Sequence, residues 1–372
     1  QGVEGIAVGL STKILPHNFV ELIDASIKVL KGQRFEILPD FPTGGIADFT
    51  QYNEGMRGGR VRVRARMGID DKKTLIITEV PYGTTTGGLI DSILKANDKG
   101  KIKIKKIEDN TAENVEIQIH LPPGVSPDKT IDALYAFTDC EVSIAPLACT
   151  IENDAPRFIS IKDVLKISTE QTVEILKREL EIKLKELQEQ WHFASLERIF
   201  IENKIYRDIE EAETWEEVIG FIRKGLKPHI QNLIREVTDD DIARLTEIRI
   251  KRISKFDSAK ADEYILDLEG KIAGVKDQLA NLIEYAIDWF KSLKQKYGKG
   301  RERKTEIRVF HDIDATKVAI ANTKLYVNRE EGFIGTSLKK DEFVTDCSDI
   351  DDIIVFRSDG KMIVTKVDQK TY

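Results

Sequence analysis

The feature that most constrains the fold is a long apolar repeat in the second half of the chain. From Ile265 to Leu293, apolar residues recur in alternating steps of three and four. That spacing is typical of a coiled-coil seam. Because a helix rises about 1.5 Å per residue, this one is expected to span roughly 50 to 60 Å. The seam positions are Ile265, Leu268, Ile272, Val275, Leu279, Leu282, Ala286, Trp289 and Leu293.

A second helical segment precedes this repeat. Between Ile161 and Asn203, four apolar residues are spaced four, three and four apart. Two long helices, at 161–203 and 258–300, separated by residues 204–257, predict an antiparallel pair with a helical knob at its tip. The four apolar residues are Leu180, Leu184, Leu187 and Trp191.

Residues 1–160 predict one α+β domain, because stretches with strand periodicity alternate with amphipathic stretches. Asn18, with Glu21 three residues later, is expected to cap the first helix. The expected helices are Asn18–Lys31, Gly88–Asp98 and Asp128–Phe137, and the expected strands are Arg60–Arg66, Thr74–Val80, Ile102–Ile107 and Val115–Leu121.

After the basic linker at 298–304, the pattern changes to short strands and predicts the start of an all-β domain over 301–372. One candidate pair joins Val318–Ala321 to Lys324–Asn328. Another joins Ile353–Arg357 to Lys361–Val367 through Asp359-Gly360, a dipeptide that suits a tight turn.

The composition limits the classes of function that are possible. The 372 residues carry a net charge of −7, which by itself disfavours a DNA-binding protein. No apolar run reaches membrane-spanning length, so no membrane partner is expected. Three cysteines without a C-x-x-C pair favour a reducing cytoplasm and argue against a structural zinc: Cys140, Cys149 and Cys347. We expect no metal site in this chain.

The densest basic cluster is a run of arginines near residue 60. From Arg60 to Arg66, arginines alternate with small apolar residues, which places their side chains on one face of a strand. Unpaired guanidinium groups in a row repel one another, and a DNA backbone would supply the anion they need. The alternative is a solvated face with acidic cross-strand partners. The cluster comprises Arg57, Arg60, Arg62, Arg64 and Arg66.

Lys13, His17 and Asn18 surround the turn at Pro16, just before the first expected helix. A lysine beside a helix N-terminus favours a phosphate site. The alternative for His17 and Asn18 is helix capping. No nucleophilic motif and no nucleotide-binding loop is found, so no catalytic residue is expected.

Two segments carry a resemblance to a known family. EGIAVGLSTKILPHN (Glu4–Asn18) and LPDFPTGG (Leu38–Gly45) resemble the A subunits of bacterial type IIA topoisomerases, namely DNA gyrase and topoisomerase IV. Three weaker resemblances follow in the family's order: ITEVPYG (Ile77–Gly83), EIRIKRISKFD (Glu247–Asp257) and RERKTEI (Arg301–Ile307). The resemblance implies a tower domain forming a DNA saddle, a coiled-coil arm, a helical dimer gate and the start of a β-pinwheel-like domain.

The resemblance also implies site residues and partners. The residue matching Ile6 is the family's wedge, pushed between base pairs to bend DNA; the alternative is that Ile6 is a core strand residue. The family's catalytic tyrosine and winged-helix domain precede this segment, so the resemblance implies an internal fragment that is inactive alone. The implied partners are double-stranded DNA, a second copy of the chain and a B subunit in an A2B2 assembly, with Mg²⁺ and ATP on the B subunit. The copies are expected to meet through an exposed apolar face comprising Ile242, Leu245, Ile248 and Phe256.

Within the family, topoisomerase IV is favoured over gyrase. The A subunits of gyrase carry a glycine- and arginine-rich box where this chain has Glu330 and Glu331. Acidic groups there would repel DNA and weaken its wrapping. The alternatives are the A subunit of a gyrase and, from another class, a non-catalytic coiled-coil scaffold that organises DNA. Either topoisomerase would act in the bacterial cytoplasm, associated with the nucleoid.

Overall fold

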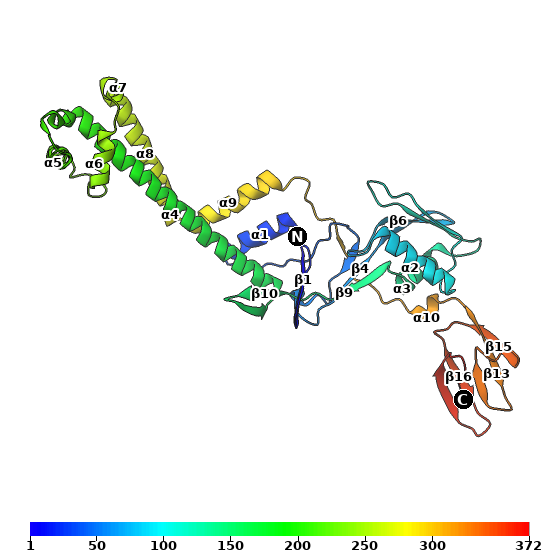
Figure 1. Cartoon of the computed structure of the whole chain (residues 1–372). Coiled ribbons are helices and arrows are strands. Elements are labelled where there is room, and N and C mark those ends of the chain that lie inside the picture. The colour runs from blue at the N-terminus through cyan, green and yellow to red at the C-terminus, as the bar shows by residue number, and fades with distance from the viewer. Residues whose placement is uncertain (372) are drawn as a thin grey trace. The chain divides into compact units, whose positions relative to one another are not determined.

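The computed structural model describes residues 1–371 and separates into two compact units (Figure 1). The larger unit comprises residues 1–25, residues 35–165 and the chain from Tyr297 onwards. The smaller unit comprises Ser26–Arg34 and Lys166–Lys296. The chain is therefore a mixture of helices and several small sheets, as the α+β prediction required.

The larger unit contains a four-stranded sheet in the order β12-β3-β4-β9. Strand β4 is antiparallel to β3 and to β9, whereas β12 pairs in parallel with β3. Val61 and Val63 on β4 are fully buried, together with Phe41 and Leu15. The strands are β3 (Ile46–Asp48), β4 (Val61–Arg64), β9 (Glu141–Ile144) and β12 (Glu306–Ile307).

A second sheet of the same unit has the order β5-β6-β8-β7 and is antiparallel throughout. Its apolar face packs against two helices, α2 (Thr86–Asp98) and α3 (Pro127–Phe137), close to where the sequence predicts them. The strand expected at 74–80 is confirmed, and that expected at 115–121 is shorter. The strand expected at 102–107 is wrong for residues 102–105, because β7 begins only at Lys106 and ends at Asp109. The strands are β5 (Arg66–Asp71), β6 (Thr74–Glu79), β7 (Lys106–Asp109) and β8 (Ile117–His120).

The beginning of the chain forms a hairpin followed by a helix. Asn18 caps that helix, because its Oδ1 accepts hydrogen bonds from the backbone N–H groups of Val20 (3.0 Å) and Glu21 (3.2 Å). The capping prediction is confirmed. The elements are β1 (Val3–Ala7), β2 (Leu10–Ile14), α1 (Phe19–Leu30), the short 3₁₀ helix Asn53–Gly55 and the hairpin of β10 (Cys149–Glu152) and β11 (Ala155–Phe158).

The smaller unit contains two long antiparallel helices. Helix α4 (Ile161–Glu202) has the length that the sequence predicts, and its seam packs against α8 (Ser258–Ala280). Trp191 Nε1 donates a 3.0 Å hydrogen bond to Glu269, and Arg198 lies 2.7 Å from Asp262, which fixes the antiparallel direction.

The expectation of one unbroken returning helix is wrong at one position. Asn281 leaves helical geometry (φ −113°, ψ 44°) and separates α8 from α9 (Leu282–Tyr297). Its side chain donates to both the backbone and the carboxylate of Asp277. Asparagine competes with helical hydrogen bonding in this way, although the apolar repeat continues past it.

The insert between the long helices has its own core. Ile242 and Leu245 are fully buried there, and Ile248 and Phe256 pack against that core. The expected exposed apolar face is therefore wrong, because these residues hold the insert together. Its elements are the 3₁₀ segment Ile205–Glu211, α5 (Trp215–Leu226), α6 (Asp239–Thr246) and α7 (Ile250–Ser254).

The C-terminal part is mostly β. The hairpin expected at 353–367 is confirmed as β16 (Asp352–Phe356) and β17 (Met362–Lys366). The strand expected at Val318–Ala321 is wrong, because Asp314 caps a short helix, α10 (Ala315–Val318). A three-stranded sheet has the order β14-β13-β15, from β13 (Thr323–Asn328), β14 (Phe333–Gly335) and β15 (Glu342–Cys347). Among residues 1–371, no helix has the length and apolar character needed to cross a membrane.

Candidate nucleic-acid interface

The first hairpin presents apolar side chains to solvent. Ile6 on β1 is 90% exposed, and Val8 in the turn is completely exposed. Gly9 completes the turn with φ +78°, a conformation that glycine adopts without strain. The alternative of a core strand residue is therefore wrong for Ile6, which lies opposite Ser11 in a two-stranded ribbon.

The base of this hairpin is fixed to another segment of the unit. Lys13 and Leu147 exchange two backbone hydrogen bonds, of 2.7 and 3.0 Å. Thr12 Oγ1 donates to the Leu147 carbonyl and accepts from the Cys149 N–H, both at 3.2 Å. The side chain of Lys13 lies 3.2 Å from Glu4 across the hairpin. Lys13 is thus held on the ribbon that displays Ile6.

Two arginines of the expected cluster lie on an exposed loop. Arg57 and Arg60 flank Gly58-Gly59, and neither side chain has a hydrogen-bond or ion-pair partner within residues 1–371. A Cβ at Gly59 would lie 2.3 Å from the Tyr52 carbonyl oxygen, so only glycine allows this close approach. Ala148 N–H donates a 2.8 Å hydrogen bond to the Gly55 carbonyl, which connects this loop to the segment that anchors the hairpin.

Arg62 and Arg64 are not free cations. Both donate to Glu141 on the neighbouring strand β9, at 2.7 and 2.6 Å, and Arg62 also donates to Asp312 at 3.0 Å. The Arg64 guanidinium lies 4.1 Å from the centre of the Phe310 ring. The expectation of unpaired guanidinium groups is wrong here, and the alternative of acidic cross-strand partners is confirmed.

Arg66 belongs to a different sheet. Ala65 separates β4 from β5, so the expected continuous strand Arg60–Arg66 is wrong. Arg66 donates to Glu79 at 3.0 Å and to Glu306 at 2.7 Å. The hydrogen bonds that Arg66 donates to these two carboxylates raise the pKa of its guanidinium group above the ordinary value.

His17 and Asn18 are occupied inside the unit. Asn18 is buried, and its amide donates to Asp40 (2.9 Å) and to the Arg301 carbonyl (3.0 Å) while its oxygen caps α1. Burial lowers the pKa of His17 to about 4, so the ring is neutral near pH 7, with Nε2 lying 3.4 Å from Tyr52 Oη. Capping accounts for Asn18, and His17 supplies no positive charge.

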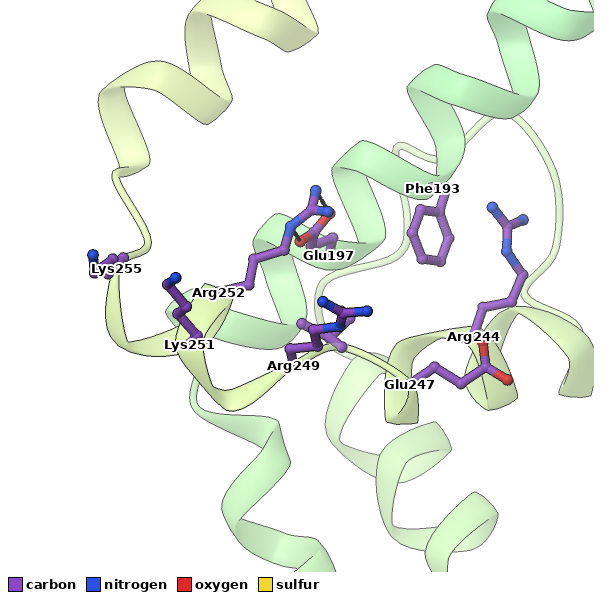
Figure 2. A pocket seen from close by; sticks show the side chains of 9 residues that line it. Phe193, Glu197, Arg244, Glu247, Arg249, Lys251, Arg252 and Lys255 are labelled. Atoms are coloured by element: carbon purple, nitrogen blue, oxygen red, sulfur yellow. Dashed lines mark hydrogen bonds and ion pairs between the residues drawn. The ribbon is translucent and has the colours of Figure 1, made fainter.

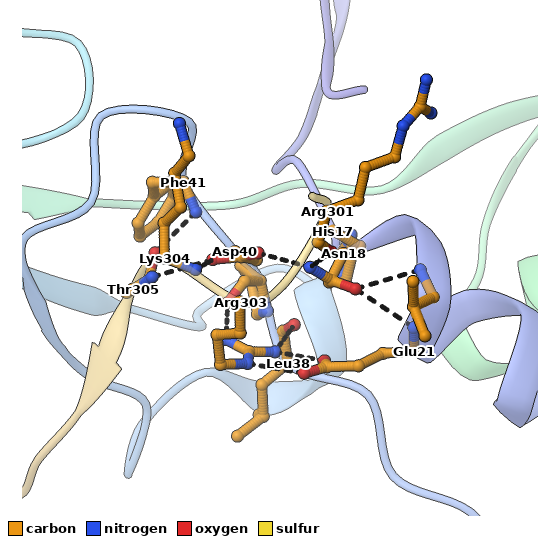
Figure 3. A network of polar contacts seen from close by, with 12 residues as sticks. His17, Asn18, Glu21, Leu38, Asp40, Phe41, Arg301, Arg303, Lys304 and Thr305 are labelled. Atoms are coloured by element: carbon orange, nitrogen blue, oxygen red, sulfur yellow. Dashed lines mark hydrogen bonds and ion pairs between the residues drawn. The ribbon is translucent and has the colours of Figure 1, made fainter. Parts of the chain in front are cut away.

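The sequence did not indicate that the resembling segments meet. Figure 3 shows Arg303 lying between Glu21 of α1 and the 38–41 segment. Arg303 donates to Glu21 at 2.7 Å and to the carbonyls of Pro39 (2.8 Å) and Leu38 (3.0 Å). Asp40 accepts from the N–H groups of residues 304 and 305, which lowers its pKa against the opposing effect of burial. Three segments with matching motifs thus form one polar network.

Comparisons with known proteins agree with this geometry. Residues 1–291 match the family model described as the A subunit of DNA gyrase/topoisomerase IV. Residues 324–372 match a model described as topoisomerase C-terminal domain, Bacteroidota. The matches cover both compact units and the C-terminal strands.

The chain therefore belongs to the family of DNA gyrase/topoisomerase IV A subunits. It is 39% identical over all 372 residues to the A subunit of DNA topoisomerase 4 from Borreliella burgdorferi and covers 59% of that relative. It is 25% identical over 333 residues to the A subunit of DNA gyrase from Brachyspira hyodysenteriae, covering 82% of this chain and 38% of the relative. The chain spans less than two thirds of the length of these relatives.

Proposed function

We propose that this chain is the DNA-bending and gate-forming part of a topoisomerase IV-like A subunit. With a B subunit, the whole protein would pass one duplex through a double-strand break in another and so decatenate or relax DNA. Family membership and the 39% identity to the A subunit of a DNA topoisomerase 4 support this over a non-catalytic scaffold. The observation that carries the proposal is the exposed Ile6 on an anchored hairpin.

In this proposal Ile6 enters a base step of the duplex. An isoleucine inserted between base pairs unstacks them, at a cost of a few kcal/mol, and kinks the DNA. A bent duplex can contact more protein surface, which offsets that cost. The hairpin suits this role because its tip is open to solvent whereas its base is bonded to residues 147–149.

Lys13, Arg57 and Arg60 would contact phosphates on either side of the kink. Arg57 and Arg60 have exposed guanidinium groups without acidic partners in the described chain, so binding would exchange counterions for protein cations. Arg62, Arg64 and Arg66 would act differently. Their carboxylate partners make them positioning residues that hold the sheets supporting the loop.

The remaining parts take the roles of a gate. Residues 1–160 would form the tower domain and DNA saddle. The α4–α8 pair would be the coiled-coil arm, the insert at 204–257 the dimer gate, and residues 301–372 the start of a β-pinwheel-like domain. Two copies would join two B subunits, which supply ATP hydrolysis and Mg²⁺, in the bacterial cytoplasm at the nucleoid. Strand breakage through a phosphotyrosine ester conserves bond energy, so the resealing step needs no separate energy source.

The test is decatenation by the complete A subunit together with its B subunit in the presence of ATP. Ile6→Ala is expected to slow decatenation by about tenfold or more, because the wedge supplies interaction energy only in the bent complex. Ile151→Ala, at another exposed hairpin position (72% exposed), is the matched control and should keep full activity. Unchanged activity of Ile6→Ala would reject the wedge, and absence of any ATP-dependent strand passage by the wild type would reject the function.

A further inference from the structure

A hollow in the smaller unit is lined mostly by basic side chains. From Arg244 to Phe256, five basic residues accompany one acidic residue, in a chain whose net charge is −7. All five line a pocket of about 680 Å³ between the insert and α4 (Figure 2). The five are Arg244, Arg249, Lys251, Arg252 and Lys255.

Few of these charges are neutralised by the protein. Arg252 donates to Glu197, a buried carboxylate of α4, at 2.6 Å. Arg249, Lys251 and Lys255 are exposed and have no ion pair within residues 1–371. The cluster around Arg62 in the larger unit is different, since each arginine there meets a carboxylate. The pocket therefore keeps an excess of positive charge.

The pocket also has an aromatic side. The Arg244 guanidinium lies 4.0 Å from the centre of the Phe193 ring in a cation–π arrangement, and both side chains line the pocket (Figure 2). Guanidinium forks and lysine ammonium groups bind phosphate oxygens through short charge-assisted hydrogen bonds. The volume suits a small ligand, because ligand pockets usually enclose about 300 to 1,000 Å³.

We propose that this pocket binds a compact polyphosphate, meaning consecutive phosphate groups that are either free or attached to a nucleoside. Arg249, Lys251 and Lys255 hold the phosphates, and Arg244 with Phe193 forms the side against which a base can stack. A long duplex is a poorer match, because its phosphates follow an extended backbone and need cations spread beyond one pocket. The site is separate from the DNA-bending hairpin and does not depend on the proposed function.

The test uses the full chain, with sodium tripolyphosphate and ATP as separate probes in titration calorimetry at low salt. Both are expected to bind saturably. The variant R249E/K251E/K255E should weaken binding by at least about tenfold, because it removes charge-assisted hydrogen bonds and adds repulsion. The matched control K183E/K185E/K276E makes the same change of charge at exposed lysines of the long helices, outside the pocket, and should alter affinity by less than about twofold.

Circular dichroism of both variants is measured alongside, to check that they remain folded. Equal affinity for the two probes identifies phosphates as the sole determinant, whereas tighter ATP binding identifies a nucleotide; both support the proposal. Absence of binding, or equal losses in the two variants, would overturn it. A short duplex bound in competition with tripolyphosphate, and lost in the pocket variant, would also overturn it by making the pocket a DNA contact.

Discussion

Whether an arginine of this chain can meet DNA depends on the carboxylates within reach of its guanidinium group. Arg62, Arg64 and Arg66 alternate along the sequence, yet each lies against glutamates supplied by other strands. Arg57 and Arg60 have no such neighbours in the described chain. They lie on either side of Gly58-Gly59, in the loop that precedes β4. Residue type alone predicts five equivalent arginines, whereas the ion pairs of the described chain leave only two of the five free to bind phosphate.

Arg57→Ala combined with Arg60→Ala is expected to weaken DNA binding by the chain and to reduce its salt dependence. Log K falls as log salt rises, and each lost phosphate contact reduces the magnitude of that slope by about one. The measurement is fluorescence anisotropy of a labelled duplex over a salt series. The control R178A/R207A removes two exposed arginines of the smaller unit, outside the proposed interface, so its slope should match the wild type. A reversed order, with the larger change in the control, would contradict this assignment.

His17 should make the larger unit sensitive to mild acid. Its folded pKa is about 4 because of burial, below the ordinary 6.5 that applies when the chain is unfolded. The unfolded state therefore binds the proton first, and stability present above pH 6.5 is lost as the pH falls towards 4. The full difference amounts to about 3 kcal/mol as an upper bound.

Urea unfolding between pH 7 and pH 4 measures this effect. His17→Gln cannot be protonated and should flatten the pH dependence, although it also loses packing. His229→Gln, at an exposed histidine of the other unit, should leave the dependence unchanged. A wild-type and a His17→Gln protein with parallel pH profiles would show that His17 is not responsible.

At the scale of elements, periodicity predicts more than the exact boundaries. Helices α1 to α4 and the β16–β17 hairpin follow from apolar spacing, capping residues and an Asp-Gly turn. The break at Asn281 does not follow from the apolar spacing, because the repeat continues past it. It goes with a hydrogen bond from the Asn281 side chain to Asp277, which competes with the hydrogen bonding of the helix backbone. Likewise, the change of sheet at Ala65 depends on which strands are neighbours, and no local pattern encodes that.

The site shows the same division between local and distant information. The capping role of Asn18 is local and was predictable. The contacts of Arg303 with Glu21, and of Arg62 with Glu141, join residues far apart in the sequence. The exposure of Ile6 also depends on the tertiary structure, since an apolar strand residue is buried in most sheets. The order of the motifs in the sequence predicted the family. That three of these segments meet in one polar network around Arg303 could be seen only in the structure.

The insert should depend strongly on one ion-pair network. Arg235 donates to Asp241 (2.6 and 2.9 Å) and to Glu189 of α4 (2.9 and 2.8 Å), and Asp241 is almost fully buried. Burial opposes ionisation of Asp241, but hydrogen bonds from Arg235 and Thr238 hold its pKa far below the ordinary value. Removing the arginine alone would leave a buried, unpaired carboxylate.

Arg235→Met is therefore expected to lower the free energy of unfolding of the smaller unit by about 3 to 5 kcal/mol. The double variant with Asp241→Asn should recover part of this loss, because the buried charge is then absent. Chemical denaturation followed by tryptophan fluorescence reports on this unit, because Trp191, Trp215 and Trp289 all lie in it. A loss below about 1 kcal/mol would place the pair among weak surface salt bridges. The exposed pair Lys291–Asp288 is the matched control, and breaking it should change the free energy of unfolding only slightly.

At the scale of the whole molecule, the C-terminal strands bear on the proposed choice between a topoisomerase IV and a gyrase. The turn between β13 and β14 contains Glu330 and Glu331, and Glu331 N–H is held by Asn328 Oδ1 at 2.9 Å. Arg329, the one basic residue of this turn, is paired with Glu342 at 2.8 and 3.0 Å. The turn therefore offers carboxylates, not free cations, to a neighbouring phosphate backbone.

Under the proposed function, DNA that is not held around this domain would give strand passage no preferred direction, and negative supercoiling requires such a direction. With its B subunit present and ATP supplied, the complete protein is thus expected to decatenate and relax plasmids without supercoiling them. Gel analysis of relaxed plasmid measures this outcome. The variant E330R/E331R tests the cause: it should strengthen DNA binding most at low salt, since the repulsion it removes is screened by ions. Efficient negative supercoiling by the wild type would instead make the protein part of a gyrase, and the acidic turn would then have no part in the distinction.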